Sequence, residues 1–433
     1  MSEGAAKKEE RRKFQAIKGT RDLLPPDTGL WSRVEQIAQG VFSSYGFGEI
    51  RLPIFEQTDL FARSIGLETD VVSKEMYSFE DRDDTSVSLR PEATASVCRA
   101  YIENGMQQLP QPVKLYTFGP MFRRERPQKG RYRQFYQIDA EVLGGSDAPG
   151  IDAELIEMVL TFFERLGLEG VELDINCIGD KKCRPKYVEL LRAELRKVKD
   201  KLGPDSQRRI ETNPLRVLDS KLENEQKLIE EMPHIADHLC EECAENYRGV
   251  KKELKLRGVK YRENWRLVRG LDYYSRTTFE VTAKGLGSQN AVCGGGRYDG
   301  LIELLGGPSM RATGFAIGED RLILSLQEAG KTPTAQGRDV YIAWMGEKAY
   351  ATAVRAAKNL RAGGFSVELP PVEQKFGKAL GQADKLGARY ALILGDNEVD
   401  TGNWTVKTLA DGTQQKLGEL QVLDFLGKNR SGG

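Results

Sequence analysis

Histidine is scarce in this chain, with only His234 and His238 among 433 residues, and both lie in the single tract PHIADHLCEEC. This scarcity excludes histidine general-base chemistry from every other segment of the chain. The six cysteines are too few to form the framework of a small disulfide-stabilised protein, so we expect them to be mostly reduced.

Long apolar runs and an excess of one charge are also missing. No segment approaches the roughly 20 apolar residues that a membrane span needs, and the opening residues MSEGAAKKEERRK carry no apolar core of a signal peptide. We therefore expect a cytoplasmic protein with no membrane partner. Lysine plus arginine and aspartate plus glutamate both number 64. Any contact with RNA must come from local patches, because the whole chain has no net field to attract it.

The common glycine motifs of nucleotide-binding folds are absent. Neither G-x-x-x-x-G-K-[ST] nor G-x-G-x-x-G occurs, so a P-loop or Rossmann fold has no support. The glycines at 294–296 could let the backbone approach a ligand, but three glycines in an expected turn are a weak signal.

The pattern along the chain predicts an α+β protein in several parts. Residues 1–13 are expected to be a disordered tail, because they are charged and poor in large apolar residues. Strand-like runs between 87 and 143 predict an antiparallel sheet, and the run at 48–56 predicts a strand whose Pro53 restricts it to an edge or an interface. Residues 314–330 are expected to form a helix.

Two further regions differ in character from this sheet. Charged helical stretches at about 180–260 predict an inserted helical domain, which interrupts a first domain of residues 14–325. A linker follows at 326–337. Strands and helices then alternate over 338–433, which predicts a small sheet covered by helices.

The segment from Met121 to Arg133 has the densest positive charge, with six arginines and lysines against the single acid Glu125. Two expected strands flank a turn at Pro127 and Gly130, so the arginines can fold over one face. Because arginine makes bidentate, permanently charged contacts, this hairpin predicts a triphosphate site. The plain alternative is a solvated, salt-bridged hairpin.

Arg269 and Arg321 are further candidate cations. Arg269 precedes a turn at Gly270 and the paired tyrosines Tyr273 and Tyr274, one of which should face inward. Arg321 stands near the start of an apolar helix, whose N-terminal dipole favours anions, although alone it would be read as a surface arginine. Activation of a carboxylic acid by ATP fits this inventory, because the carboxylate is itself the nucleophile and needs only positioning and charge stabilisation.

The tract around the two histidines invites a zinc hypothesis, since His234, His238, Cys240 and Cys243 fall within ten residues. On one continuous helix, however, the histidines and the cysteines point to different sides. The four could converge only if the helix broke between them. We therefore expect a helical surface with incidental thiols and no zinc site in the protein.

Seven segments together resemble histidyl-tRNA synthetase, in order and in spacing. They are KGTRDLLP (18–25), GEIRLPIFE (48–56), LRPEATA (89–95), GPMFRRERPQKGRYRQFYQIDAEVLG (119–144), RGLDYYSRTTFE (269–280), GGGRYDGL (294–301) and GFAIGEDRL (314–322). The resemblance implies a class II aminoacyl-tRNA synthetase: an antiparallel sheet flanked by helices, with a helical insertion and a C-terminal α/β anticodon-binding domain.

The resemblance also assigns the ATP site. Arg123 would hold the α-phosphate and the substrate carboxylate, and Arg269 would stabilise the charge that develops on the α-phosphate. Glu125 and Phe135 would meet the adenine, with Tyr132 in the same site, and Arg131 and Arg321 would bind the outer phosphates. Mg²⁺ is expected on those outer phosphates.

For histidine, the family pattern places Glu92, Thr94 and Gln137 at the amino group. Glu141 and Tyr274 would face the two ring nitrogens, Tyr298 would close the pocket, and Tyr273 would line it. An imidazole offers one donor and one acceptor, so such a pair would reject apolar isosteres. Arg126 and Gln128 would face the acceptor end of histidine tRNA. A homodimer is implied, with the helix from about Leu30 and the Pro53 strand at its interface.

The sequence departs from the family pattern at a few positions. Arg124 stands where histidine is frequent and Ala93 where glycine is frequent, and neither removes an assigned contact.

A noncatalytic regulatory paralogue that binds histidine is the main alternative, but it typically lacks the C-terminal domain and the motif arginines. A related synthetase for threonine, proline or glycine is a second alternative, which RGLDYY and GGGRYDG disfavour.

Overall fold

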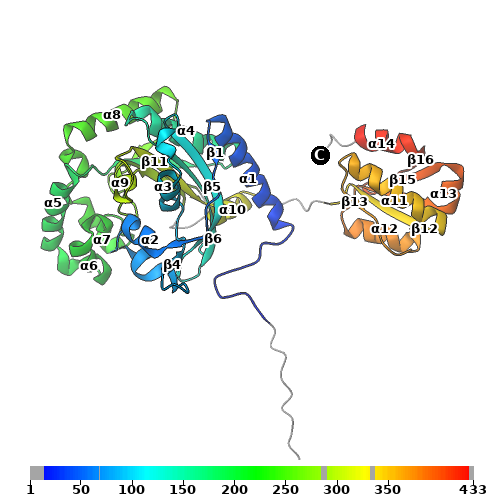
Figure 1. Cartoon of the computed structure of the whole chain (residues 1–433), viewed down its shortest axis with the longest axis horizontal. Helices are drawn as coiled ribbons and strands as arrows, with labels where there is room; N and C mark the ends of the chain where they lie inside the picture. The colour runs from blue at the N-terminus through cyan, green and yellow to red at the C-terminus, as the bar shows by residue number, and fades with distance from the viewer. Residues whose placement is uncertain (1–13, 68, 284–289, 332–336, 429–433) are drawn as a thin grey trace, which may run out of the picture. The chain divides into compact units, whose positions relative to one another are not determined.

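The computed structural model describes residues 14–67, 69–283, 290–331 and 337–428. The predicted tail, 1–13, and residues 332–336 of the predicted linker lie outside this range. The described residues divide into two compact units, the first built mainly from residues 14–23 and 30–331 and the second mainly from residues 337–428 (Figure 1).

An eight-stranded sheet is the centre of the first unit. Its six inner strands pair antiparallel and its two edge strands, β1 and β8, pair parallel. The strands lie in the order β1 (Gly48–Glu49), β5 (Val113–Phe122), β6 (Gln134–Leu143), β11 (Ala312–Gly318), β10 (Ala291–Arg297), β9 (Ser275–Thr282), β7 (Glu172–Cys177) and β8 (Arg262–Glu263). The predicted antiparallel sheet is confirmed.

Helices cover both faces of this sheet. The main apolar core lies between one face and four helices, which are α1 (Asp27–Ser44), α4 (Pro149–Leu166), α8 (Glu241–Leu256) and α10 (Glu319–Glu328). A smaller core joins the sheet to α3 (Thr94–Glu103) and α9 (Leu301–Leu304). Because α10 continues to Glu328 and buries Leu326, the first residues of the predicted linker 326–337 belong to this helix.

A small antiparallel sheet and short helical segments flank α3 in the chain. The sheet has the order β2 (Phe55–Gln57), β4 (Ser86–Leu89) and β3 (Tyr77–Glu80). Alongside it in the chain are α2 (Thr58–Ile65), the π-helical turn η1 (Val71–Glu75) and the 3₁₀ turn η2 (Met106–Gln108). The single strand predicted over 48–56 is instead divided into β1 and β2, and Pro53 lies between them, where its missing N–H costs no ladder bond.

The helical insertion has a core of its own, built from residues such as Tyr187, Leu191 and Ile210. Its elements lie together beside the sheet (Figure 1): α5 (Arg184–Lys197), η3 (Lys199–Lys201), α6 (Pro204–Thr212), η4 (Pro214–Val217), α7 (Glu223–Glu230) and η5 (Ile235–His238). The next helix, α8, returns to the main core, where it buries Tyr247 and Val250, and it packs on α4.

The second unit is a five-stranded mixed sheet with helices. The order is β13 (Val367–Glu368), β12 (Val340–Met345), β14 (Tyr390–Gly395), β15 (Asn403–Thr408) and β16 (Gln414–Gly418). Its helices are α11 (Glu347–Ala362), α12 (Phe376–Lys385), α13 (Asp396–Thr401) and α14 (Glu419–Lys428). The predicted alternation of strands and helices is confirmed.

Two local predictions were wrong. Glycines 294–296 lie inside strand β10, not in a turn, and residues 314–318 belong to strand β11, so the helix predicted from 314 begins only at Glu319. Both segments were misread for the same reason: glycine is disfavoured in strands unless another group approaches the backbone closely, and that group cannot be seen in the sequence. In the part of the chain that the structure describes, no helix is long and apolar enough to cross a membrane.

Candidate functional site

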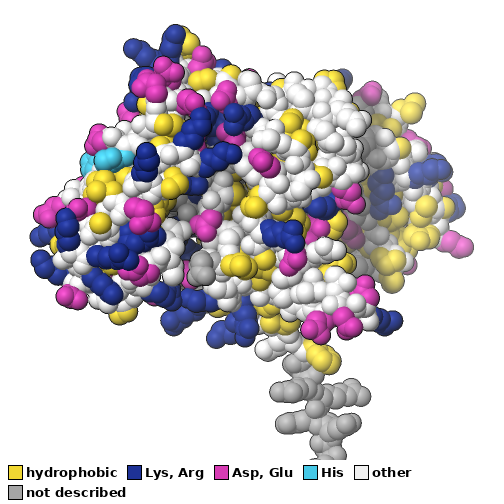
Figure 2. All heavy atoms as spheres, turned by 60° about the vertical axis from the view of Figure 1, so that its left-hand side comes forward, with side chains coloured by type: hydrophobic (Ala, Val, Ile, Leu, Met, Phe, Trp, Pro, Cys, Tyr) yellow, Lys and Arg dark blue, Asp and Glu magenta, His cyan; other side chains and the backbone are white. Residues whose placement is uncertain are grey.

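A cavity of about 660 Å³ opens in the first unit between the β5–β6 hairpin, strands β9 and β10, and the helical insertion. Figure 2 shows a face of the molecule on which many lysine and arginine side chains gather around a hollow. Twelve of the residues predicted from the sequence line this cavity: Glu92, Thr94, Arg123, Glu125, Arg131, Tyr132, Phe135, Gln137, Arg269, Tyr273, Tyr274 and Arg321.

Strand β6 supplies the cavity floor through its alternation. Ile138, Ala140 and Val142 point into the main apolar core. Because successive side chains of a strand point to opposite faces, Gln137, Asp139 and Glu141 share the other face. All three of these polar side chains are buried. The amide of Gln137 and the carboxylate of Asp139 therefore line the cavity. Glu141 is the next residue on the same face of the strand.

Arginines crowd one end of the cavity. The Arg123 Nε atom donates to the carbonyl oxygen of Pro91 at 2.9 Å, and its guanidinium lies 5.4 Å from the centre of the Phe135 ring. Arg131 pairs with Glu125 at 3.3 Å. Burial, and then the positive charge of Arg131, lower the pKa of Arg321. Cations that oppose one another in this way favour binding of an anion between them.

Arg269 has a fixed position on the adjoining wall. Its Nη1 atom lies 3.1 Å from Oε2 of Glu280 on β9, and its guanidinium is 5.7 Å from the centre of the Tyr274 ring. Gly294 makes room for it, because a Cβ atom at position 294 would lie only 2.0 Å from Arg269 Nη2. Gly294 is thus a close-packing position for the arginine, whereas Gly295 and Gly296 pack against the neighbouring strands β11 and β9.

The other end of the cavity is rich in acceptors. Glu92 accepts the backbone N–H groups of Thr94 and Ala95 at 2.8 and 3.0 Å, and burial raises its pKa. Among the described residues, none offers a hydrogen bond to either carboxylate oxygen of Asp139 or to Oε1 of Gln137. Burial, and then the charge of Glu92, raise the pKa of Asp139 well above its usual value. This end suits a cationic or hydrogen-bond-donating group.

Glu141 and Tyr298 lie beneath this acceptor end and do not line the cavity. Glu141 accepts hydrogen bonds from Thr94 Oγ1 at 2.6 Å and from the Tyr298 hydroxyl. Burial raises the pKa of the Glu141 carboxyl well above its usual value. Tyr298 in turn packs edge-on against Tyr273, with ring centres 5.6 Å apart. Both oxygens of Glu141 are therefore engaged.

Arg126 and Gln128 lie apart from the cavity, exposed in the loop of the β5–β6 hairpin. Gln128 forms a short backbone bridge with Arg131, which shapes the loop. Arg21, in the first of the quoted segments, reaches the same region: its guanidinium lies 3.9 Å from the centre of the Tyr132 ring and 2.6 Å from Asp320.

Several lining residues were not predicted from the sequence. Arg209 and Arg216 come from the helical insertion, and their place in the cavity depends on how that insertion folds back. Asp139 and Glu280 were inside quoted segments, but no role was assigned to them. The strand alternation of β6 could have indicated Asp139, because it shares the parity of Gln137 and Glu141.

The histidine and cysteine tract does not form the continuous helix that we predicted. The chain is extended at Leu239 and Cys240, between η5 and α8. The His234 ring stacks on Trp265, with centres 4.0 Å apart, and the His238 ring lies 5.7 Å from that of Tyr187. The residues from Pro233 to Cys240 are thus irregular apart from the short turn η5, and the predicted helix is absent there. The two histidines pack on aromatic rings.

Comparison with known proteins places this cavity in a family. The family model for histidyl-tRNA synthetase matches residues 19–180 and 187–322, which include every residue of the cavity wall. The chain belongs to the histidyl-tRNA synthetase family. A second model, the anticodon binding domain, matches residues 339–429.

Individual relatives match along nearly the whole chain. A histidine–tRNA ligase of Solibacter usitatus is 54% identical over 405 residues, covering 93% of this chain and 96% of that protein. One from Koribacter versatilis is 50% identical over 433 residues, with 97% and 98% covered. Among solved structures, the apo histidyl-tRNA synthetase of S. aureus is 37% identical with a TM-score of 0.80, covering 96% of this chain and all of that one. The predicted family and the class II fold are thereby confirmed.

Proposed function

We propose that this protein activates histidine with ATP to form histidyl-adenylate and then transfers the histidyl group to the 3′ end of histidine tRNA. The observation that carries the proposal is the uneven distribution of charge in one cavity: arginines line one end, and the other end holds acceptors that have no hydrogen-bond partner among the described residues. A nucleoside triphosphate fits the arginine end, and an amino acid fits the acceptor end. Membership of the histidyl-tRNA synthetase family supports this assignment of the two ends.

The triphosphate lies along the arginines. Arg123 contacts the α-phosphate and the substrate carboxylate, and Arg131 and Arg321 contact the outer phosphates. Glu125, Tyr132 and Phe135 form the adenine end, where Phe135 offers a face for stacking. Permanently charged, forked guanidinium groups suit phosphate oxygens, which supports this assignment.

Arg269 stabilises the reaction's developing charge. The histidine carboxylate attacks the α-phosphate, and pyrophosphate leaves. No proton has to be removed from the nucleophile, so the site requires positioned positive charge and no general base. The contact with Glu280 orients the Arg269 guanidinium, which supports its role as a preorganised donor.

The histidine substrate occupies the acceptor end. Its ammonium group meets Glu92, Thr94 and Gln137, and Tyr273 lines the same wall. Glu141 and Tyr274 read the two ring nitrogens, and Tyr298 closes the pocket from below. The engaged state of Glu141 supports a selective role, because a buried carboxylate held by two donors is fixed in orientation.

Mg²⁺ accompanies the outer phosphates of ATP. The cavity wall fits it, since Glu75 and Glu280 present carboxylate oxygens beside the arginines, and oxygen donors are what this ion prefers. One of these carboxylates, together with the phosphates, would hold the ion, which would supply neutralising charge when bound.

Transfer to tRNA uses the surface beyond the cavity. Arg126 and Gln128, exposed in the hairpin loop, face the acceptor end of the tRNA, and the C-terminal unit binds the anticodon. The enzyme acts in the cytoplasm as a homodimer. Exposed apolar side chains on and beside the small sheet, Ile54, Phe55 and Phe79, support a subunit interface there.

ATP–pyrophosphate exchange, measured with each of the 20 amino acids in turn, tests this proposal. Exchange that depends on histidine alone is the expected result. Exchange with no amino acid would favour the noncatalytic regulatory function, and exchange with a different amino acid would overturn the assignment of histidine. The near full-length likeness to histidine–tRNA ligases favours the catalytic function over the regulatory one.

A further inference from the structure

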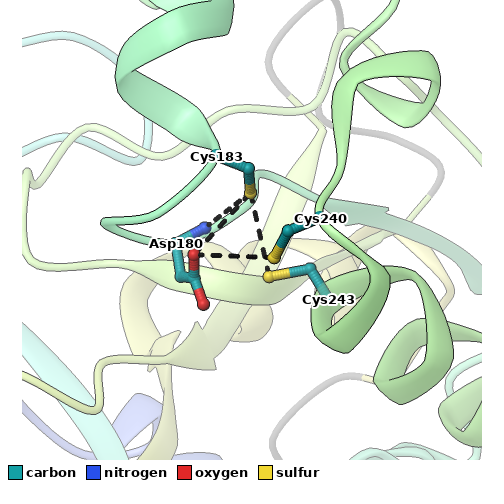
Figure 3. Close-up of side chains that lie close together, drawn as sticks. All are labelled: Asp180, Cys183, Cys240 and Cys243. Carbon is teal, nitrogen blue, oxygen red and sulfur yellow. Dashed lines mark hydrogen bonds between the residues drawn. The ribbon is translucent and has the colours of Figure 1, made fainter.

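Four potential metal ligands meet at a point outside the cavity. They are the side chains of Asp180, Cys183, Cys240 and Cys243, whose ligand atoms all lie within 4.8 Å of one another (Figure 3). The first two come from the loop that leads into α5, and the last two from the start of α8. Among the six cysteines, none is in a disulfide. The function proposed above makes no use of this group.

The separations between these atoms match a four-coordinate ion. The Cys183 and Cys243 sulfur atoms are 3.9 Å apart, and Asp180 Oδ1 lies 3.7 Å from the sulfur of Cys183 and 4.0 Å from that of Cys240. Zinc–sulfur bonds of about 2.3 Å in a tetrahedron place the ligand atoms about 3.8 Å apart. A disulfide would bring two sulfur atoms to about 2.05 Å. The arrangement therefore suits an ion held between the side chains and not a bond between two of them.

The spacing in the sequence points to the same chemistry. Each pair of ligands is separated by two residues, as in many structural zinc sites with three or four cysteines. Cys183 is the N-cap residue of α5, which has 14 residues, and Cys240 is the N-cap residue of α8, which has 16. Two helix N-termini thus point their positive ends toward the group, which favours thiolates.

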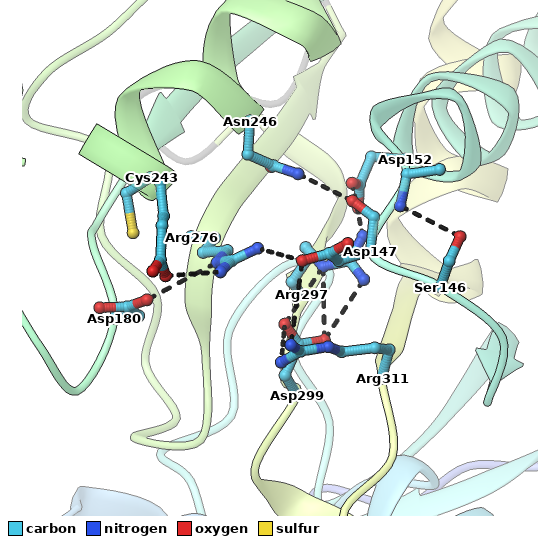
Figure 4. Close-up of polar contacts among 12 residues, drawn as sticks. Ser146, Asp147, Asp152, Asp180, Cys243, Asn246, Arg276, Arg297, Asp299 and Arg311 are labelled. Atoms are coloured by element: carbon cyan, nitrogen blue, oxygen red, sulfur yellow. Dashed lines mark hydrogen bonds and ion pairs between the residues drawn. The ribbon is translucent and has the colours of Figure 1, made fainter. Parts of the chain in front are cut away.

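The surroundings can hold the charge of such a site. Cys183 and Cys243 are buried, so a bound ion would be shielded from water by the side chains that hold it. Arg276 lies behind Asp180, with Nε 3.7 Å from its carboxylate, and also donates to Asp147 at 2.9 Å (Figure 4). A divalent ion would neutralise two of the four negative charges of three thiolates and one carboxylate, and this buried arginine adds one more positive charge beside Asp180.

We infer that Asp180, Cys183, Cys240 and Cys243 bind one structural zinc ion at the base of the helical insertion. Asp180 and Cys240 are 60 residues apart, and the insertion lies between them, so the ion ties its entry to its exit. The site also reaches the cavity: Arg184, next to Cys183, donates to the backbone carbonyl of Tyr274. The ion would thereby fix the insertion against the wall that carries Tyr274.

Elemental analysis of the purified full-length protein tests the inference. The expected result is one zinc ion per chain, retained through gel filtration. Cys240→Ser and Cys243→Ser should lose it. Cys177→Ser is the matched control, because Cys177 is a buried thiol three residues before Asp180 but lies outside the group. Equal zinc in all three variants, or no zinc in the parent protein, would overturn the inference.

Cobalt substitution keeps the test valid if the serine variants fail to fold. The parent protein is stripped with a chelator under reducing conditions and titrated with Co²⁺. Thiolate-to-cobalt charge-transfer bands together with intense visible bands of tetrahedral cobalt, saturating at one ion per chain, are expected. Weak octahedral bands without charge transfer, or a disulfide between these cysteines found by mass spectrometry of the untreated protein, would refute the site. Neither readout depends on aminoacylation, so the proposed function and the zinc site can fail independently.

Discussion

The Arg269 guanidinium lies 3.1 Å from the Glu280 carboxylate, on the wall between the arginine end and the acceptor end of the cavity. Replacing Arg269 with alanine should lower the rate of ATP–pyrophosphate exchange by about 10²–10³-fold, because a preorganised donor at the developing charge is lost. Circular dichroism and gel filtration should be unchanged. Arg248→Ala, at an exposed position on α8, is the control and should keep the parent rate. Parent exchange rates in Arg269→Ala would refute the proposed role.

Gly294 should tolerate no side chain without loss of activity. An added methyl group would lie 2.0 Å from Arg269 Nη2, so the guanidinium must move away from its position. We expect Gly294→Ala to reduce exchange while the protein stays folded. The control is Gly300→Ala, where nothing lies within 4 Å of the added carbon. If the two alanine variants were equally active, the packing role of Gly294 would be wrong.

Glu141 should control the use of histidine more than the use of ATP. Glu141→Gln keeps the shape but replaces one carboxyl oxygen with an amide N–H donor, so one of the hydrogen bonds from Thr94 and Tyr298 is lost, a change of about 1–3 kcal/mol. We expect kcat/KM for histidine to fall about tenfold or more, with a much smaller change in KM for ATP. Steady-state exchange kinetics with each substrate varied separate the two effects, and an equal change in both KM values would contradict the prediction.

Strands β5 and β6 and the whole C-terminal unit could be predicted, because their apolar patterns are local. The strand position of Gly294 could not be predicted, because the group that packs on it, Arg269, lies 25 residues away in sequence and meets it only in the folded sheet. Arg209 and Arg216 reach the cavity only through the fold of the insertion. The cysteine group could not be predicted for the same reason, because Asp180 and Cys183 meet Cys240 and Cys243 across 60 residues.

Arg297 and Asp152 form a buried ion pair, and the loss of this pair should lower the free energy of unfolding. Their charged atoms lie 2.7 Å apart, and both side chains are almost inaccessible to water. Arg297→Met would leave a buried carboxylate without its partner and should cost about 3–5 kcal/mol. Equilibrium denaturation with urea measures this. As a control, Glu211→Gln breaks the exposed pair with Arg196 and should leave the midpoint unchanged.

Glu319 should make stability depend on pH. Burial, and then the charge of Glu35, raise its pKa to about 9, and among the described residues neither carboxylate oxygen has a hydrogen-bond partner. In the unfolded chain this pKa is about 4.3. The neutral acid is therefore favoured by the folded state, and that stability is complete below the unfolded pKa and is lost as pH rises toward 9.

Glu319→Gln removes this titration and keeps a neutral side chain. We expect the melting temperature of the variant to match the parent near pH 4.5 and to exceed it by a margin that grows up to about pH 9. Differential scanning calorimetry across this range measures the margin. A constant difference between the two proteins at every pH would show that Glu319 does not titrate as described.

The close approach of Gly294 to Arg269 also constrains how this chain can vary over evolution. A side chain at position 294 and the arginine at 269 cannot both occupy the volume that the guanidinium now fills. Substitutions at the two positions should therefore occur together. In descendants of this chain that have given up adenylate formation, and with it Arg269, position 294 would be released from selection for glycine and would accumulate larger residues.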